Sequence, residues 1–536
     1  MLTYFVVAPI FLSVLLYLGS SRNWARIIAI LSQTVLFVLS LQVFLQIAET
    51  DEIIRTPIGG YYGVMGVVLV ADRLSSMFVM LTTFIFLIAS VFSYRAKHSR
   101  LFWFLMFLWQ STMIGTFLSG DFFNIFVLTE IATITVTVLI MYNREKRSMY
   151  DGLIYMIINT VIIQFYLFGV GYLYMMTGSL DMNLTAERLA YIDRSNLILP
   201  YALIMTFVGL KCAMMPMYAW LPKAHGSKGA PSSVSAILSG LHIKSGIYLF
   251  LRFSDILQAI NGQELFLVIG AITAITGVIL AVAQSDIKLM LAYSTVAQVG
   301  LIIVGLNISY VGSYNYVGAL YHIINHAVFK VALFLSAGIV VYSYNTRDIN
   351  QIRGVLKKMP VVATAKILAI LGIIGTPLFN GSISKYFLMA GLNWQLEAVL
   401  ILVNMGTIII FIKYSSIFFG KSDTVLDRSH HDPVRDWIVA FLGLLCFGLG
   451  IFGAQVIEFL FGYTVSIDFL GYIQKTIIFG VSFVAGYFIY KSMFTEENAF
   501  AYFLAWEKKA EMGFRGMCFS ITAFFAFILI VVGFYN

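Results

Sequence analysis

Apolar stretches of about 20 residues recur from one end of this 536-residue chain to the other. A helix of that length crosses a bilayer, and helices are favoured in lipid because backbone polar groups must be satisfied within the segment. Soluble chains carry about a quarter charged residues, whereas only 11% are charged here. The alternating pattern of a membrane β-barrel is absent. The sequence therefore predicts an all-α polytopic membrane protein.

Hydropathy and polar loops predict about 14 to 16 transmembrane helices. The first expected span has no basic n-region and no cleavage site, so we expect a retained helix rather than a signal peptide. The span that contains Pro377 is unusually long, so we expect a broken helix there. The expected spans lie near residues 2–19, 27–47, 74–94, 101–118, 122–141, 152–176, 198–220, 231–251, 264–283, 289–308, 315–342, 361–393, 397–419, 437–460, 471–490 and 514–535.

Basic side chains concentrate in the loops that follow odd-numbered spans. The even-numbered loops contain only Arg55, Arg73, Arg188, Arg194 and Arg252. The positive-inside rule therefore predicts that the odd loops are cytoplasmic and that both termini lie outside. This distribution accounts for the net charge of +8, so we expect no nucleic-acid partner.

Seven lysines fall inside the expected spans, where a charge at the bilayer centre costs about 2.5–3.5 kcal/mol. Lys366 and Lys475 lie near span ends, so we expect their long side chains to snorkel to the interface. Other lysines lie deeper or beside helix breaks, which favours a polar pathway inside the protein. The expected pathway lysines are Lys211, Lys244, Lys330 and Lys385, and the seventh lysine is Lys413.

Glu130 stands in the middle of an expected span, where a carboxylate needs a cationic partner or a proton. We expect Lys211 to be that partner. Burial lowers a lysine pKa and a nearby carboxylate raises it, so such a pair can load and release a proton as the distance changes. A static structural ion pair is the alternative.

Two histidines and a lysine recur at four-residue spacing in one expected span. His322, His326 and Lys330 therefore share one face of a helix. Histidine titrates near neutral pH, which suits a proton relay. Two histidines at this spacing can also bind a metal, but no acidic third ligand is nearby and Lys330 would repel a cation. The pattern favours a relay.

Prolines at membrane depth indicate helix breaks, which are tolerated where they are buried in protein or face water. Pro216 follows Lys211 by five residues, and Pro377 precedes Lys385 by eight. The two sites are five spans apart, so a repeat of that unit would be inverted in the membrane. We expect an N-terminal segment at 1–100, five-helix repeats at 101–253 and 254–420, and C-terminal helices with a short interfacial segment at 421–536.

Five stretches of this chain resemble the antiporter-like subunits of respiratory complex I and of Mrp-type cation/proton antiporters. Lysine at position 385, where one branch of the family has glutamate, is similar to the Mrp D type or the distal complex I type. The stretches stand in family order within roughly residues 70–420: Gly120–Phe126 leading to Glu130, Lys211–His225 continuing through Ala230–Ala236 to Lys244–Tyr248, Gln284–Ser294, His322–Lys330, and Gly375–Lys385.

This resemblance implies two inverted five-helix repeats with broken helices at spans 7 and 12, and a row of charged groups and water along the membrane midplane. It implies that Glu130 and Lys211 form the first acid–lysine pair and that Lys385 is the terminal lysine. Between them would lie a relay of Lys244, His322, His326 and Lys330. The accessory candidates are His242, His225, Lys223 and Lys413.

The sequence does not decide which kind of complex contains this chain. The chain has about two spans beyond the fourteen common in the family. Residues 491–513 are too short for the long lateral helix of the distal complex I subunit and favour an amphipathic interfacial helix. Mrp antiporters, membrane-bound hydrogenases, sulfur reductases and complex I-like enzymes all fit, and we expect the plasma membrane of a prokaryotic cell.

The expected function is proton translocation within a multisubunit membrane complex, coupled to Na⁺ exchange or to redox chemistry in partner subunits. The alternatives are a self-sufficient transporter for a small solute and a structural subunit with an inactive channel. We expect no cofactor and no catalytic site in this chain, because it has no nucleotide-binding loop and its cysteines are far apart. The cysteines are Cys212, Cys446 and Cys518.

Overall fold

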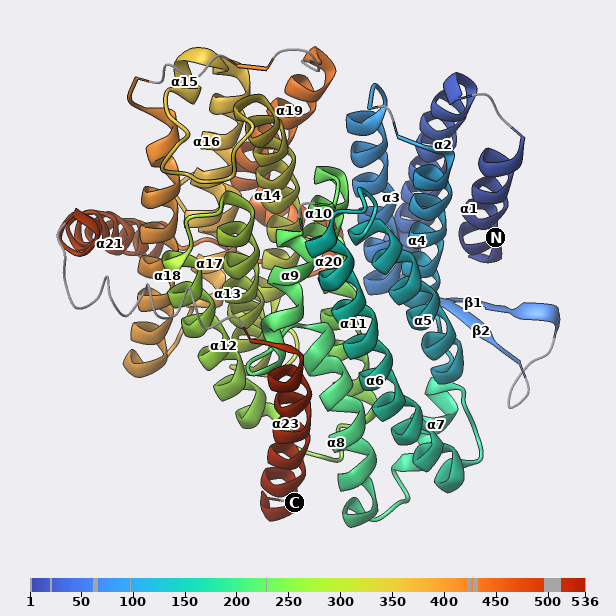
Figure 1. The fold of residues 1–536 in the computed structure, drawn as a ribbon. Coiled ribbons are helices and arrows are strands. Elements are labelled where there is room, and N and C mark those ends of the chain that lie inside the picture. The colour runs from blue at the N-terminus through green and yellow to red at the C-terminus, as the bar shows by residue number, and fades with distance from the viewer. Residues whose placement is uncertain are drawn as a thin grey trace. The chain divides into compact units, whose positions relative to one another are not determined.

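The chain is helical almost throughout (Figure 1). The computed structural model describes residues 2–19, 22–60, 66–96, 98–227, 229–421, 426–427, 432–495 and 512–535. In these ranges thirteen helices are long and apolar enough to cross a membrane, and Leu2–Leu18 and Pro360–Ile374 are shorter apolar helices. The one other expected span, near residues 198–220, corresponds to the helix Arg194–Lys211. The prediction of an all-α polytopic membrane protein is confirmed.

Two compact units make up the chain. The first contains Met1–Ile237, Leu241–Gly262 and Phe514–Asn536, and the second contains Leu238–Gly240 and Gln263–Gly513. The inverted repeats at 101–253 and 254–420 stay a prediction. The interfacial helix expected within 491–513 lies mostly outside the described residues, and the preceding helix extends to Thr495.

The first unit is a bundle of helices with one small hairpin. Its elements are α1 (Leu2–Leu18), α2 (Arg22–Thr50), β1 (Ile54–Pro57), η1 (Ile58–Gly60), β2 (Val68–Ala71), α3 (Arg73–Ser93), α4 (Arg100–Leu118), α5 (Phe122–Ile140), α6 (Lys146–Thr177), α7 (Met182–Leu189), α8 (Arg194–Lys211), η3 (Met217–Ala219), α9 (Trp220–Gly226), α10 (Ser232–Ile237), α11 (Ile243–Ile256) and α23 (Phe514–Tyr535).

The second unit is also helical. Its elements are α12 (Gln263–Ala283), α13 (Ile287–Asn307), α14 (Tyr314–Tyr344), α15 (Val355–Lys358), α16 (Pro360–Ile374), α17 (Asn380–Leu388), α18 (Trp394–Ser415), η5 (Ser416–Phe418), α19 (Pro433–Ile451), α20 (Gly453–Phe461) and α21 (Phe469–Thr495). The π-helical turn η4 (Leu238–His242) joins α10 to α11.

The hairpin was not predicted, because its strands are only four residues long. They pair antiparallel, with Ile54 opposite Ala71. Helix α3 begins directly after the second strand, and Asp72 caps it. The Asp72 carboxylate accepts a hydrogen bond from the backbone N–H of Ser75 at 2.8 Å, and the Ser75 hydroxyl accepts one from the Asp72 N–H at 2.9 Å. Together they form a capping box that satisfies two backbone donors.

Aspartates also begin the helices that follow two of the sequence motifs. Asp121 caps α5 by accepting from the N–H of Asn124 at 2.7 Å. Asp286 caps α13 by accepting from the N–H groups of Lys288 and Leu289 at 2.8 and 3.0 Å. Asp121 and Asp286 therefore serve to start helices.

The C-terminal helix α23 packs against α8 in the first unit (Figure 1). A Cβ atom at Gly209 of α8 would lie 2.7 Å from Cε1 of Phe524 of α23, so a larger residue there would displace the Phe524 ring. Phe525 of α23 also contacts Phe165 of α6, with ring centroids 5.5 Å apart. The last helix of the chain thus supports the two helices that carry Lys211 and its neighbours.

Candidate functional site

Helix α8 ends at Lys211, which is the break predicted near Pro216. Cys212 is the C-cap residue, and Ala213 has a positive φ of 50°, so the chain turns out of the helix there. The indole N–H of Trp220 donates to the freed carbonyl of Leu210 at 2.7 Å. The same carbonyl accepts the backbone N–H of Ala213 at 2.8 Å, so the indole adds a second hydrogen bond at the end of the helix. The break holds Lys211 in the interior of the unit.

The Lys211 ammonium is buried and donates to the amide oxygen of Asn159 on α6 at 2.8 Å. Its Nζ also lies 5.7 Å from the centroid of the Phe207 ring. Within the described residues Lys211 forms no ion pair with Glu130. Glu130 lies on α5 and is half-buried, within electrostatic range of Lys211. The acid–lysine pair expected from the sequence is therefore not in direct contact, and a neutral amide occupies the position next to the ammonium.

Helix α11 carries Lys244, which is fully buried. Two residues later, Gly246 lies against the end of α8. A Cβ at Gly246 would be 2.7 Å from the carbonyl carbon of Lys211 and 2.8 Å from the backbone nitrogen of Cys212. Only glycine permits this contact between two backbones. Gly246 thereby fixes the spacing of the helices that carry Lys211 and Lys244.

His242 is buried at the end of the π-helical turn, and its two ring nitrogens have different partners. The Trp109 indole N–H donates to Nδ1 at 3.3 Å, and the Tyr155 hydroxyl lies 3.2 Å from Nε2. Because an indole only donates, Nδ1 must be unprotonated in this arrangement. His242 is thus held as a neutral ring. The π-helical turn that positions His242 could not be predicted from the hydropathy pattern.

Lys223 and His225 both lie on α9, the short helix after the break. His225 is buried, and Lys223 is half-buried. Lys228 lies outside the described residues. The accessory role of Lys223 and His225 stays a prediction.

In the second unit, His322 on α14 lies between two neutral side chains. Its Nδ1 is 2.9 Å from the hydroxyl of Ser384, and its Nε2 is 2.9 Å from the amide oxygen of Gln298. Nε2 must donate to the amide oxygen, whereas the serine hydroxyl can either donate or accept. His322 can therefore be neutral or charged with the same partners. This freedom suits the relay role predicted for it.

His326 and Lys330 follow on the same helix, and both are buried. The rings of His322 and His326 have centroids 6.4 Å apart, so the shared helix face is confirmed for the two histidines. The Lys330 ammonium donates to the carbonyl of Leu291 at 2.8 Å and to the hydroxyl of Ser294, both on α13.

Lys385 lies on α17, after the break predicted at Pro377. Helix α16 ends at Ile374, and its C-cap residue Gly375 has a positive φ of 82°. The Lys385 ammonium donates to the carbonyl of Ile373 at 2.7 Å and to the amide oxygen of Asn404 at 2.7 Å. The helix break therefore supplies one of its acceptors, because the last carbonyls of a helix have no partner within it.

The remaining lysines differ from one another. Lys413 donates to the carbonyls of Val282 and Gln284 near the end of α12, at 2.7 Å each. Lys475 of α21 is paired with Glu397 and partly exposed. Lys366 has 0% exposure, and its Nζ lies 4.9 Å from the centroid of the Tyr414 ring. The expectation that Lys366 snorkels is therefore wrong: α16 is buried among other helices, so the stem has no surface within reach.

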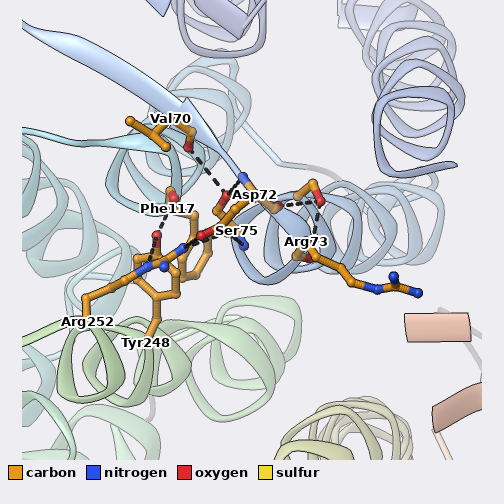
Figure 2. A network of polar contacts seen from close by, with 8 residues as sticks. Val70, Asp72, Arg73, Ser75, Phe117, Tyr248 and Arg252 are labelled. Atoms are coloured by element: carbon orange, nitrogen blue, oxygen red, sulfur yellow. Dashed lines mark hydrogen bonds and ion pairs between the residues drawn. The ribbon is translucent and has the colours of Figure 1, made fainter. Parts of the chain in front are cut away.

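A polar network at one end of the first unit was missed by the sequence analysis, which assigned Arg252 to a loop. Figure 2 shows Arg252 reaching from α11 to Asp72, the capping residue of α3. Arg252 Nη2 lies 2.7 and 2.6 Å from the two carboxylate oxygens of Asp72, and Nε donates to the Tyr248 hydroxyl at 3.0 Å. Tyr248 in turn donates to the carbonyl of Phe117 at 2.6 Å. The four-residue spacing of Lys244, Tyr248 and Arg252 was the available signal.

The acceptors around the buried lysines have one property in common. Those recorded for Lys211, Lys330 and Lys385 are amide, carbonyl or hydroxyl oxygens rather than carboxylates. A carboxylate would hold a buried lysine in its charged form, whereas a neutral oxygen adds no opposite charge. The ammonium groups of these lysines are therefore hydrogen-bonded without a carboxylate in direct contact.

Comparison with known proteins gives consistent matches. The family described as NADH:quinone oxidoreductase/Mrp antiporter, TM, matches residues 119–410. The N subunit of the NADH-quinone oxidoreductase of Desulforudis audaxviator (strain MP104C) is 34% identical over 375 residues, which are 67% of this chain and 74% of that protein. The D subunit of the Na(+)/H(+) antiporter of Bacillus subtilis (strain 168) is 27% identical over 83% of this chain and 94% of that protein.

A solved structure shares the fold. A chain of the Mrp complex from Dietzia sp. DQ12-45-1b superposes with a TM-score of 0.79 over 89% of this chain and 99% of that one, at 21% identity. The family model covers more than half of the sequence and includes most of the motifs identified above. The chain therefore belongs to the NADH:quinone oxidoreductase/Mrp antiporter transmembrane family.

Proposed function

We propose that this chain is a proton-translocating, antiporter-like subunit of a multisubunit membrane complex. The observation that carries the proposal is the set of buried lysines bonded to neutral oxygens: Lys211 to Asn159, Lys330 to Leu291 and Ser294, and Lys385 to Asn404 and Ile373. The family membership supports the same role, because the relatives include antiporter D subunits and a subunit of a quinone oxidoreductase.

In the proposed mechanism, protons enter the first unit at Lys211 and leave the second unit from Lys385. Glu130 is half-buried on α5 and sets the charge near Lys211. When Glu130 moves or is neutralised, the proton on Lys211 is held less firmly, because its hydrogen-bond partner Asn159 has no charge. In the second unit His322 exchanges a proton without changing partners, and Lys330 and Lys385 carry it further.

The direct test is proton transport by the purified complex in sealed vesicles, with a pH-sensitive dye inside. Lys211→Ala is expected to reduce transport to background while the complex still assembles. Lys357→Ala is the matched control, because Lys357 lies on the short helix α15 and is exposed. Wild-type transport by Lys211→Ala would refute the proposal, and loss of transport in both variants would show that the assay reports assembly instead.

A second part of the proposal concerns what drives proton translocation. Both Na⁺ exchange and redox chemistry in partner subunits are consistent with the relatives of this chain. Gentle purification of the native complex, with subunit identification and iron and nickel analysis, separates the two. Iron together with hydrophilic redox subunits would make this chain the pump of a respiratory complex. A metal-free assembly of membrane subunits that exchanges Na⁺ for protons would make it part of an antiporter.

A further inference from the structure

Lys385 borders a pocket in the second unit that the mechanism above does not use. The space in the pocket that water molecules can occupy is about 40 Å³, and its lining combines apolar side chains with Ser382, Lys385, Asn404 and Lys475. One water needs about 10–15 Å³ of such space, so the pocket can hold about three waters. The pocket thus reaches from the buried Lys385 toward Lys475 on α21.

The two lysines that line the pocket differ in their surroundings. Lys385 is buried and bonded to neutral oxygens. Lys475 pairs with the Glu397 carboxylate, and their side chains are 22% and 27% exposed. Two ammonium groups on one pocket repel a metal cation, so the space is suited to water and protons rather than to a bound ion. Glu397 is next to the pocket because it pairs with the lining residue Lys475.

Glu397 lies where two features of the structure favour a negative charge. It lies in the first turn of α18, where the positive end of the helix dipole stabilises a carboxylate. Lys475 adds a positive charge from α21. Both side chains are partly exposed whereas Lys385 is buried, so Glu397 lies nearer the surface than Lys385.

We propose that Glu397, which pairs with the lining residue Lys475, accepts the proton that leaves this pocket, and that Lys475 is the residue that positions it. The proposal rests on the proton-translocating function above. The Lys385 ammonium gives a proton to water in the pocket and becomes a neutral amine. A proton passes along the water to the Glu397 carboxylate, which becomes a carboxylic acid and then releases the proton to solvent. Lys475 stays charged throughout and restores the anion.

The test is proton transport by the reconstituted complex carrying Glu397→Gln, an isosteric change that removes only the ability to take up a proton. Transport is expected to fall at least about tenfold, since a positioned acid or base contributes at least that much to a proton-transfer step. Glu397→Asp, which keeps the carboxylate, should retain most of the rate. Glu264→Gln is the matched control, because Glu264 is an exposed carboxylate in the first turn of α12 in the same unit.

A purely structural role for the ion pair predicts a different pattern. In that case the double variant Glu397→Gln with Lys475→Gln, which removes both charges together, would regain transport. Recovery of the double variant, or a wild-type rate for Glu397→Gln, would overturn the proposal. A double variant as slow as Glu397→Gln, in a complex that elutes intact from a sizing column, supports it.

Lys211→Ala and Lys385→Ala, measured in the same vesicles, separate this inference from the function on which it rests. If both lysine variants transport normally, proton translocation by this chain is refuted. The role proposed for Glu397 is then refuted as well. If both are inactive while Glu397→Gln transports at the wild-type rate, only the role of Glu397 is refuted.

Discussion

Removal of the Arg252 guanidinium is expected to destabilise the first unit by about 1–3 kcal/mol. Arg252 Nη2 contacts both oxygens of the Asp72 carboxylate, and Nε binds the Tyr248 hydroxyl. Hydrogen bonds to charged groups contribute about 1.5–3 kcal/mol each. The two side chains are 25% and 23% exposed, so solvent screening reduces the sum. Asp72 keeps its bond from the Ser75 N–H, which leaves the cap of α3 in place in Arg252→Gln.

The contribution of this pair depends on pH in a direction that follows from the charge of Asp72. Burial by itself would raise the pKa of the Asp72 carboxyl, but the Arg252 guanidinium and the Ser75 hydrogen bonds outweigh burial and hold the pKa below its ordinary value of 3.8. A folded pKa below the unfolded one stabilises the fold wherever the carboxylate is charged in both states. The contribution is therefore complete above about pH 5 and is lost as the pH falls through the folded pKa.

The assay is unfolding of the purified protein in mixed micelles with increasing SDS, followed by tryptophan fluorescence between pH 3 and pH 8. Asp72→Asn keeps the oxygen that caps α3 and removes only the charge. Its free energy of unfolding is expected to lie about 1–2 kcal/mol below wild type at neutral pH and to approach wild type at pH 3. A difference that stays constant down to pH 3 would refute the electrostatic explanation. So would a double variant with Arg252→Gln whose loss equals the sum of the two single losses.

Two further predictions concern the lysines. Gly246→Ala would place a Cβ 2.7 Å from the backbone of Lys211, so we expect a loss of about 1–3 kcal/mol in stability and slower proton transport; Gly448→Ala, where nothing lies within 4 Å, is the control that should change neither. Asn404→Asp would turn the neutral acceptor of Lys385 into an anion, whose attraction at about 4 Å is about 4 kcal/mol in a protein interior of effective dielectric 20. We expect at least tenfold slower transport with no loss of stability, and a wild-type rate in the vesicle assay would show that Lys385 does not need to release its proton.

Hydropathy predicted the helices well because the length of an apolar run is a local property. Prolines likewise predicted the breaks after Lys211 and before Lys385, because a missing N–H and a fixed φ weaken a helix locally, although Pro9 and Pro200 lie inside α1 and α8. The π-helical turn before Lys244 has no proline and was missed. A change in helix geometry that depends on packing leaves no mark in the composition of a span.

The partners of the charged groups were predicted poorly, because they depend on which helices meet. Asn159 and Asn404 are amides in largely apolar spans, and nothing local distinguishes them from other amides. Opposite charge suggested Glu130 as the partner of Lys211, but the helix that reaches the ammonium is α6 rather than α5. The prediction for Lys366 was wrong for a similar reason. Its position in the sequence does not show that other helices surround α16 and bury the lysine.

The helix breaks and the neutral partners answer the same physical requirement. A proton carrier must be tolerated with and without its charge, so its surroundings must solvate an ammonium without supplying a permanent anion. A broken helix meets that requirement with carbonyls that have no partner in the helix, as Ile373 does for Lys385. A carboxylate is useful only where the proton must be drawn away, toward solvent or toward a neighbouring subunit. Glu397 and Glu130 are both partly exposed, whereas Lys211 and Lys385 are buried, so in each unit the acids lie nearer the surface than the lysines they would serve.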